Sequence, residues 1–424
     1  MRNIKQKNTL WYASLSIFCL FSFSMLLSAC EQAQNNDGKI HLKLWYWNRS
    51  IDDGLINAVS KQFPNIVLEA DKINDYDNKV RTTLAGHYGV PDILGINTNV
   101  APFFPDEDQF VDLKTLGAEE LHSQYLDWKW NLGMTPSGRM IAFPMDTGPT
   151  ALFYRADIFK QAGLPYEPDA VANSLKTWDD YIQAGVKLKN ATGGKSMMFD
   201  TATTIYTQMM AQSSKQYFDP SGKFIGDQAQ IKNAWNEATK VVQMGLSAKL
   251  QMWTTDWNKG IVNGLTASFV GAAWMKQILQ ETAPATAGKW RVTYAPGGAG
   301  NSGGSFLAIT KASQHPKEAF EVIKWLQSPE NQVVGYTNIQ LFPSTISAFS
   351  APQLHQAEAF YGGEDTTKIF AQSATQIPRY YMGPDDGTVS GPITDQLALV
   401  EFQHKTPDQA WTDAIQRGQR ELLR

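Results

Sequence analysis

Cysteine is almost absent from this chain of 424 residues, which holds only Cys19 and Cys30. A disulfide framework and a cysteine metal site are therefore excluded beyond residue 30. The six histidines are scattered, with no two of them three or four residues apart, so no zinc or iron ligand set is visible. We interpret the acidic clusters at residues 106–108 and 385–386 as exposed, solvated loops rather than calcium sites. We therefore expect no metal and no cofactor.

Excess charge of one sign is also missing. The formal net charge is -4 and no block of five or six like charges occurs, which argues against a nucleic-acid partner. The absence of a repeat of fixed period excludes solenoids and propellers.

No apolar run of membrane-spanning length follows the first thirty residues. A content of 43% hydrophobic and 12% aromatic residues indicates a folded protein. The length is that of roughly two domains.

The first thirty residues indicate export. Three basic residues precede an uncharged apolar stretch at residues 11–27, and small residues follow it, which predicts a signal peptide at residues 1–29. Residues 27–30 (Leu-Ser-Ala-Cys) resemble the bacterial lipobox, and this resemblance implies a lipid on the Cys30 thiol. Residues 30–38 would then be the lipidated cysteine and a tether. We expect an extracytoplasmic protein anchored to the cell membrane by this lipid; an incidental cysteine behind an ordinary signal is the alternative.

Strands and helices alternate in the first part of the remaining chain. Apolar patterning predicts strands at residues 40–47, 65–70 and 91–96, with helices at 53–63 and 76–85 between them. This order is typical of a parallel, doubly wound α/β sheet. Because such sheets bind ligands beyond the carboxyl ends of their strands, the loops that follow the first and third strands are candidate ligand contacts. Their amide and hydroxyl groups suit a neutral polar ligand.

Later segments continue the α/β pattern. Thr177 and Asp180 have the spacing of a capping box, which predicts a helix that begins after Thr177. Further strands are expected at residues 151–154 and 305–309, and further helices at 156–162, 227–245, 317–326 and over most of 395–423.

Catalytic motifs are weak. Residues 300–304 match the nucleophile string G-x-S-x-G, but a glycine-rich loop precedes Ser302 and a strand follows it, the reverse of what that motif requires. Residues 194–196 (Gly-Lys-Ser) lack the earlier glycine of a phosphate-binding loop, since Lys189 stands there. Paired carboxylates of a glycoside hydrolase have no fixed sequence spacing, and Asp146 is the one attractive strand-end carboxylate. We expect a protein that is not an enzyme.

Four segments carry a family resemblance through their order and spacing. They are residues 63–66 (Phe-Pro-Asn-Ile), 89–93 (Gly-Val-Pro-Asp-Ile), 143–180, and 271–275 (Gly-Ala-Ala-Trp-Met) together with 303–309. From about residue 42 to the C-terminus the chain resembles the bacterial ABC-transporter extracellular solute-binding lipoproteins of the carbohydrate-binding type, family 1, distantly similar to maltose-binding protein. The resemblance implies an α/β, two-lobed periplasmic-binding-protein-like fold with a ligand cleft between the lobes.

The resemblance also implies domain boundaries and site residues. Because the chain of such proteins crosses between lobes several times, one lobe is expected at 39–147 plus 304–352 and the other at 148–303 plus 353–424. The implied ligand contacts are Trp47, Asn48, Asn97, Thr98, Asp146, Thr147, Gly303, Gly304, Tyr380, Tyr381, and Trp274 as the ring that stacks on a sugar. Asn48-Arg49 stands where maltose-type relatives carry an Asp-Lys pair, which puts maltodextrin as the ligand in doubt. We interpret Trp253 and Trp257 as helix-packing residues.

The chemistry of these residues suits a sugar, which has apolar C–H faces and a rim of hydroxyls that call for aromatic platforms and oriented polar groups. The leading hypothesis is a monomeric, non-catalytic receptor that captures a mono- or oligosaccharide and delivers it to an ABC permease. It would touch the membrane only through its lipid. The alternatives are a lipid-anchored extracellular glycoside hydrolase and a binding protein for a non-sugar solute, which would need an arginine–carboxylate clamp.

Overall fold

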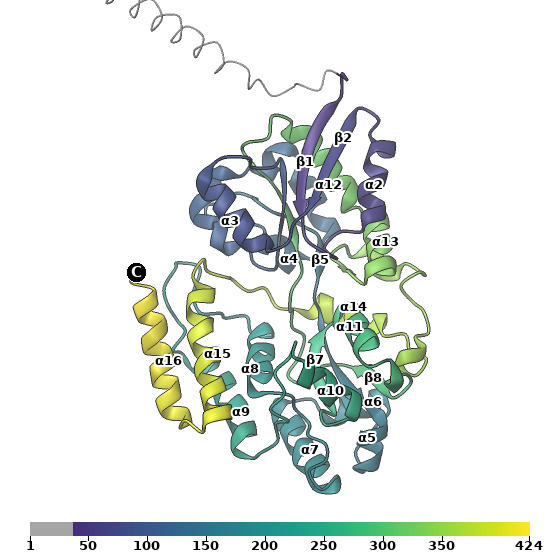
Figure 1. Ribbon diagram of the computed structural model, residues 1–424, viewed down its shortest axis with the longest axis vertical. Helices are drawn as coiled ribbons and strands as arrows, with labels where there is room; N and C mark the ends of the chain where they lie inside the picture. The colour runs from purple at the N-terminus through teal and green to yellow at the C-terminus, as the bar shows by residue number, and fades with distance from the viewer. Residues whose placement is uncertain (1–36) are drawn as a thin grey trace, which may run out of the picture.

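The structure is a computed structural model that describes residues 37–424; the predicted signal peptide and Cys30 lie outside the described residues. Figure 1 shows the helices and strands gathered into two lobes, with α2, α3 and α12 in the upper one and α5 to α10 in the lower one. We call the upper one lobe 1 and the lower one lobe 2. Within residues 37–424, no helix combines the length and the apolar character that a membrane span requires.

Each lobe is built around its own sheet. Lobe 1 has five strands in the order β2-β1-β3-β9-β4, and lobe 2 has three in the order β7-β6-β8. β10 and β5 form a separate two-stranded sheet, and Figure 1 shows β5 between the lobes. β1 pairs in parallel with β2 and β3, which confirms the doubly wound start predicted from the sequence. The strand bounds are β1 (Ile40–Tyr46), β2 (Ile66–Lys72), β3 (Ile93–Ile96), β4 (Phe143–Pro144), β5 (Asp146–Thr147), β6 (Thr150–Arg155), β7 (Ser268–Ala272), β8 (Trp290–Thr293), β9 (Phe306–Ile309) and β10 (Phe342–Pro343).

The helices that the hydrophobic spacing predicts are present, and the structure adds others that the sequence analysis did not predict. The α-helices are α2 (Asp53–Gln62), α3 (Tyr76–Gly86), α4 (Asp127–Leu132), α5 (Ala156–Gln161), α6 (Pro168–Ser174), α7 (Trp178–Ala191), α8 (Ala202–Ala211), α9 (Ala229–Gln243), α10 (Thr255–Asn263), α11 (Met275–Thr282), α12 (Pro316–Leu326), α13 (Pro329–Ile339), α14 (Thr367–Gln376), α15 (Asp386–Gln403) and α16 (Pro407–Glu421). Short 3-10 helices are η1 (Ala101–Gln109), η2 (Leu113–Leu116), η3 (Ala118–Gln124), η4 (Pro284–Thr286), η5 (Ser347–Ser350) and η6 (Ala359–Tyr361).

Local chemistry explains several helix ends. The capping box predicted at Thr177 and Asp180 is present and opens α7, because each side chain satisfies a backbone N–H that the helix leaves unpaired. The C-terminal helical segment differs from the prediction. It begins at Asp386, nine residues earlier than expected, and a left-handed residue, His404 (φ 59°), ends α15 before α16 begins. The Thr406-Pro407 pair marks this break in the sequence, because a proline can begin a helix but disfavours a helical conformation in the residue before it.

The two lobes share a core on one side. An apolar cluster joins Trp128 of α4, Tyr336 of α13 and Phe342 of β10 to the strands of lobe 2. Polar bonds reinforce it: the Trp128 indole N–H donates to the Ala374 carbonyl (2.9 Å), and the buried Lys276 Nζ donates to the Tyr336 hydroxyl (2.9 Å). The lobes are therefore fastened along α4, α13 and α14. The lobe boundaries expected at 147/148 and 303/304 remain predictions.

Candidate functional site

A large cavity lies between the lobes, opposite the shared core. Its volume is about 960 Å³. Lobe 1 lines it with α3, the end of β3 and the segment that follows β3, and lobe 2 contributes Pro384, Gly387 and Thr388 at the start of α15. Figure 1 shows α3 above α15 on this side of the molecule. A space of this size holds a small oligosaccharide rather than a single solvent molecule.

The ends of β1 and β3 bring four of the predicted residues to this region. Asn97 and Thr98 are exposed and line the cavity. Asn48 is exposed in the turn after β1, and the Trp47 ring packs on Tyr76, with ring centroids 5.0 Å apart. Gly95 makes room for that ring, since a Cβ there would lie 2.9 Å from it. Tyr76 itself lines the cavity, so Trp47 contacts a residue of the cavity wall.

Asp146 and Thr147 have a different environment, because both are buried where the chain passes between the lobes. We call the two neighbouring segments there, residues 146–149 and 301–305, the crossing. The Asp146 carboxylate accepts the backbone N–H of Ser305 (2.8 Å), and the Thr147 hydroxyl donates to the Pro343 carbonyl (2.9 Å). These bonds connect the outgoing and returning segments of the crossing. The structure therefore does not bring either side chain to the cavity with Asn97 and Thr98, and its geometry favours a structural role for both.

A buried lysine that sequence reasoning missed accompanies Asp146. Lys129 of α4 is almost completely buried, with its ammonium 3.4 Å from the centroid of the Phe306 ring. Burial lowers the pKa of Lys129 and raises that of Asp146, and the attraction between the two charges opposes both shifts. Gly304 passes between them, since a Cβ there would lie 2.7 Å from the Asp146 carbonyl and 3.1 Å from Lys129 Nζ. The crossing therefore leaves no room for a side chain at position 304. The left-handed φ of 87° at this position also favours glycine.

A chain of contacts runs from the cavity along the crossing into lobe 2. Thr98 and the predicted pair Tyr380 and Tyr381 line one small pocket. The Asn301 amide donates to the Tyr380 hydroxyl (3.2 Å) and to the Gly303 carbonyl (3.0 Å). Burial raises the pKa of Tyr380 from its usual value, at which the phenol is already neutral at physiological pH, to about 12. Gly303 is thus linked to Tyr380 through Asn301, and its contact with a ligand stays a prediction.

Trp274 occupies the lobe 2 end of this chain of contacts. Its indole N–H donates to the Ser302 carbonyl (3.0 Å), and its ring is only partly buried at the start of α11. The neighbouring Trp253 fits the helix-packing interpretation only in part. Its ring contacts Trp257 of α10, with centroids 6.4 Å apart. It is nevertheless 60% exposed, and its ring also stacks on Trp274, with centroids 5.8 Å apart and planes 21° apart. Trp257 is fully buried, which confirms the same interpretation for that residue.

One ion pair joins the two walls. Arg49, in the turn after β1, has a left-handed φ of 65° and reaches Glu281 at the end of α11, with 3.4 Å between Nη1 and Oε2. Both side chains are more than a third exposed, so the pair is worth a few tenths of a kcal/mol at most. It places the loop that carries Asn48 opposite the helix that starts after Trp274.

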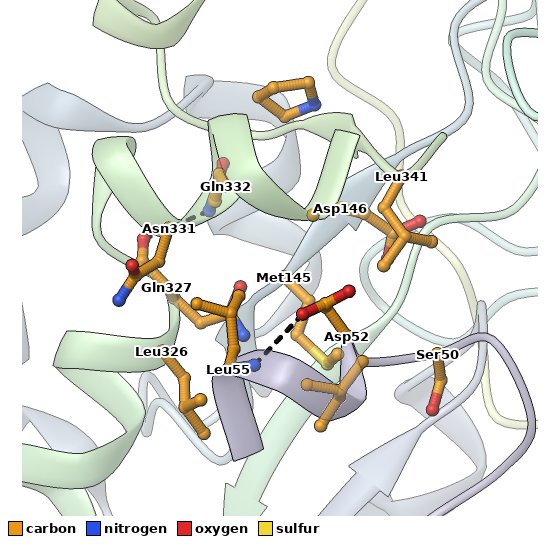
Figure 2. Close-up of a pocket in the computed structure, with 13 residues that line it drawn as sticks. Ser50, Asp52, Leu55, Met145, Asp146, Leu326, Gln327, Asn331, Gln332 and Leu341 are labelled. Carbon is orange, nitrogen blue, oxygen red and sulfur yellow. Dashed lines mark hydrogen bonds between the residues drawn. The ribbon is translucent and has the colours of Figure 1, made fainter. Parts of the chain in front are cut away.

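A second cavity, shown in Figure 2, is too small to receive a sugar. Its volume is about 30 Å³, and it lies among α2, α13 and β5. Asp52 points into this region and accepts the backbone N–H of Leu55 (3.0 Å), which caps α2. A space of this size holds about one water molecule. We therefore interpret this cavity as a packing defect beside the crossing.

Asp386, at the first residue of α15, corrects the expectation of an exposed acidic loop at residues 385–386. Its side chain is only 4% exposed, and neither carboxylate oxygen accepts a hydrogen bond. Burial raises the pKa of Asp386 to about 7. Among residues 37–424, no group of three or more His, Cys, Asp or Glu side chains is placed to hold a metal ion.

This burial predicts a pH dependence. Because the folded pKa lies above the unfolded value near 3.8, the protonated carboxyl contributes stability that is complete below about pH 4 and is lost as the pH rises to about 7. We expect Asp386→Asn to raise the free energy of unfolding at pH 8 by about 2–4 kcal/mol and to leave it nearly unchanged at pH 4. Urea unfolding at both pH values measures this. The exposed neighbour Asp385 supplies the control, because Asp385→Asn should leave the loss of stability between pH 4 and pH 8 unchanged. An equal gain in stability for Asp386→Asn at both pH values would contradict the assignment.

Comparisons with known proteins identify the family. Residues 48–333 match the family of bacterial extracellular solute-binding proteins, a match over more than half of the chain. The chain belongs to this family. A crystal structure of an extracellular solute-binding protein of family 1 is 30% identical to this solute-binding protein, with a TM-score of 0.86 over 90% of this chain and 99% of that chain. The family and the two-lobed α/β fold expected from the sequence are confirmed.

Individual relatives of this solute-binding protein are named for sugars. The arabinooligosaccharide-binding protein of Bacillus subtilis strain 168 is 23% identical over 92% of this chain and 96% of that protein. The lactose-binding protein of Rhizobium radiobacter is 28% identical, and the match spans 59% of this chain and 60% of that protein. These relatives are binding proteins rather than enzymes. Since the family is extracellular, the chain is assigned outside the cytoplasm.

Proposed function

We propose that this protein captures a short oligosaccharide between its lobes and delivers it to the permease of an ABC importer. The observation that carries the proposal is the chemistry of the interlobe region. There, uncharged polar groups of Asn97 and Thr98 lie at the cavity, and the aromatic rings of Tyr380, Trp274 and Trp253 continue from it along the crossing. Aromatic faces with a few oriented polar groups are what a sugar requires. The sugar ligands named for the relatives support this choice.

The shape of the molecule supports capture by closure. The lobes share a core along α4, α13 and α14 and are separated by the cavity on the side of α3 and α15. A rotation about the crossing would therefore open or narrow the cavity without breaking the core. A ligand that touches both lobes shifts the equilibrium toward the closed form by its extra contacts there. The permease would then recognise the closed form.

The carboxylates at the cavity favour a receptor over a hydrolase. Asp77 and Asp106 line it, and both belong to lobe 1. A glycoside hydrolase needs a pair of carboxyl groups that flank the scissile bond. Asp146, the strand-end carboxylate noted in the sequence, is committed to the crossing. We therefore propose a protein that does not cleave its sugar, that acts as a monomer and that is held at the membrane by lipid on Cys30.

A thermal-shift screen tests the proposed function. Residues 32–424 are mixed with lactose, β-1,6-galactobiose, arabinotriose and the matching monosaccharides, and the sugar is recovered and analysed afterwards. A sugar at one hundred times its dissociation constant should stabilise the fold by about 2.7 kcal/mol. We expect a higher melting temperature with at least one oligosaccharide, which is recovered intact. Cleaved sugar would favour the hydrolase, and stabilisation by amino acids or peptides alone would favour another solute.

A further inference from the structure

Trp253 is an exposed tryptophan. Among residues 37–424 it is the one tryptophan that belongs to the exposed large hydrophobic residues. An exposed indole offers a large apolar face and one hydrogen-bond donor to a solute. With 60% of its surface exposed, the Trp253 ring is open to solvent on the side away from its ring contacts, and its indole N–H makes no hydrogen bond within the described residues. The ring is stacked on Trp274 and also contacts the buried Trp257, with centroids 6.4 Å apart and planes 34° apart.

The backbone holds this ring in place. Trp253 has a left-handed φ of 72°, which is a genuine outlier for a bulky residue and is found where the surrounding structure enforces it. The loop is fixed on both sides: the Leu250 N–H donates to the Asp200 carbonyl (3.0 Å), and the Thr254 hydroxyl caps α10 by accepting the Trp257 N–H (3.2 Å). The ring is therefore presented outward by a strained, anchored loop.

The partner ring fixes where Trp253 points. Trp274 is tied to the Ser302 carbonyl, and its indole nitrogen lies next to Gly148 and Gly303, since a Cβ on either glycine would come within 3.3 Å of it. Both glycines belong to the segments that cross between the lobes. Glu281, at the far end of the helix that follows Trp274, contacts Arg49 of lobe 1. The indole pair thus belongs to the wall of lobe 2 at the interlobe region.

We propose that Trp253 is the platform that receives a sugar ring and that Trp274 backs it as a positioning residue. This inference rests on the proposed function and adds to it. The free face of Trp253 would cover the apolar face of one ring of a neutral oligosaccharide, and its indole N–H would donate to a hydroxyl. Because the cavity with Asn97 and Thr98 lies at the other end of the contact chain, the same ligand would need more than one ring to engage both.

Titration of variants with lactose, β-1,6-galactobiose and arabinotriose tests this inference. For the sugars that the wild type binds, Trp253→Ala should raise the dissociation constant at least tenfold, and Trp253→Phe should recover most of the affinity. Trp253→Gly should lose affinity as the alanine variant does but melt higher than it, because glycine adopts a φ of 72° without strain. Phe402→Ala, which removes another exposed aromatic ring from α15, is the matched control and should bind as the wild type does.

Two optical measurements report on the ring itself. Stacked indoles give an exciton couplet in circular dichroism, which Trp253→Phe should abolish and sugar binding should perturb. Added sugar should also protect the wild-type fluorescence from acrylamide. Unchanged affinity in Trp253→Ala, with sugar still bound by the wild type, would overturn this inference alone. If the wild type binds none of the sugars, the proposed function and this inference fall together.

Discussion

Gly148→Ala should destabilise the protein by about 3 kcal/mol. A Cβ on Gly148 would lie 1.9 Å from the Ser302 carbonyl oxygen and 2.7 Å from its carbon. Both contacts are with backbone, and the two segments are bonded to each other, since the Ser302 N–H donates to the Gly148 carbonyl (2.8 Å). Neither segment can move without breaking the crossing. Urea unfolding measures the loss, and sugar affinity should fall as well because Trp274 depends on Ser302.

A second glycine supplies the control with the opposite sign. Gly335 lies within α13, has no left-handed φ, and a Cβ there would meet nothing within 4 Å. Alanine is the better helix former, so Gly335→Ala should stabilise the protein by up to about 1 kcal/mol. It would also fill part of the small cavity in Figure 2. If Gly148→Ala unfolded at the same urea concentration as the wild type, the crossing would be less tightly packed than its geometry indicates.

Trp274→Ala should weaken sugar binding by about 30-fold to 1,000-fold, which corresponds to about 2–4 kcal/mol. The truncation removes the ring that supports Trp253 and leaves the Ser302 carbonyl without its donor. Its effect should therefore be larger than that of Trp253→Ala, which removes only the outer ring. Isothermal titration with the sugars that stabilise the wild type measures both variants.

Two variants separate binding from folding. Trp274→Phe keeps an aromatic ring but loses the bond to Ser302, so its affinity should lie between those of the wild type and Trp274→Ala. Trp411→Ala removes a ring that packs on Trp235 in lobe 2, with centroids 5.5 Å apart. It should lower the melting temperature and leave sugar affinity unchanged. Equal binding by Trp274→Ala and the wild type would remove the indole pair from the site.

Local sequence signals predicted part of the secondary structure. The helices that they did not predict are α4, α6, α8, α10, α11, α13 and α14. The apolar alternation of residues 40–47 and the capping box at Thr177 depend on neighbours within a few residues, so the sequence alone shows them. The predicted strands and helices between residues 40 and 96 are all present. The expectation that most of residues 395–423 is helical did not place the break between α15 and α16, although Pro407 at the first turn of α16 signals it.

Some site residues are also placed by local sequence signals, and others only by contacts between segments distant in sequence. Asn97 and Thr98 lie at the end of a parallel strand, and strand order alone brings them to the ligand edge of the sheet. The burial of Asp146 depends on Ser305, 159 residues away along the chain, and that of Lys129 depends on Phe306. A lysine between two tryptophans gives no local sign that its ammonium is buried. These contacts exist only once the chain has crossed between the lobes and returned.

The sequence by itself determined the family, the two-lobed α/β fold and the polar, aromatic character of the interlobe region, because these follow from local patterns and from the order of motifs. Only the tertiary structure decided which of the candidate residues are free to meet a solute. It commits Asp146 and Thr147 to the crossing and exposes Trp253, which the sequence pattern assigned to packing. The physical reason is that exposure depends on segments that are distant in sequence. The segment around Ser302 crosses beside Gly148 and anchors Trp274, which in turn supports Trp253.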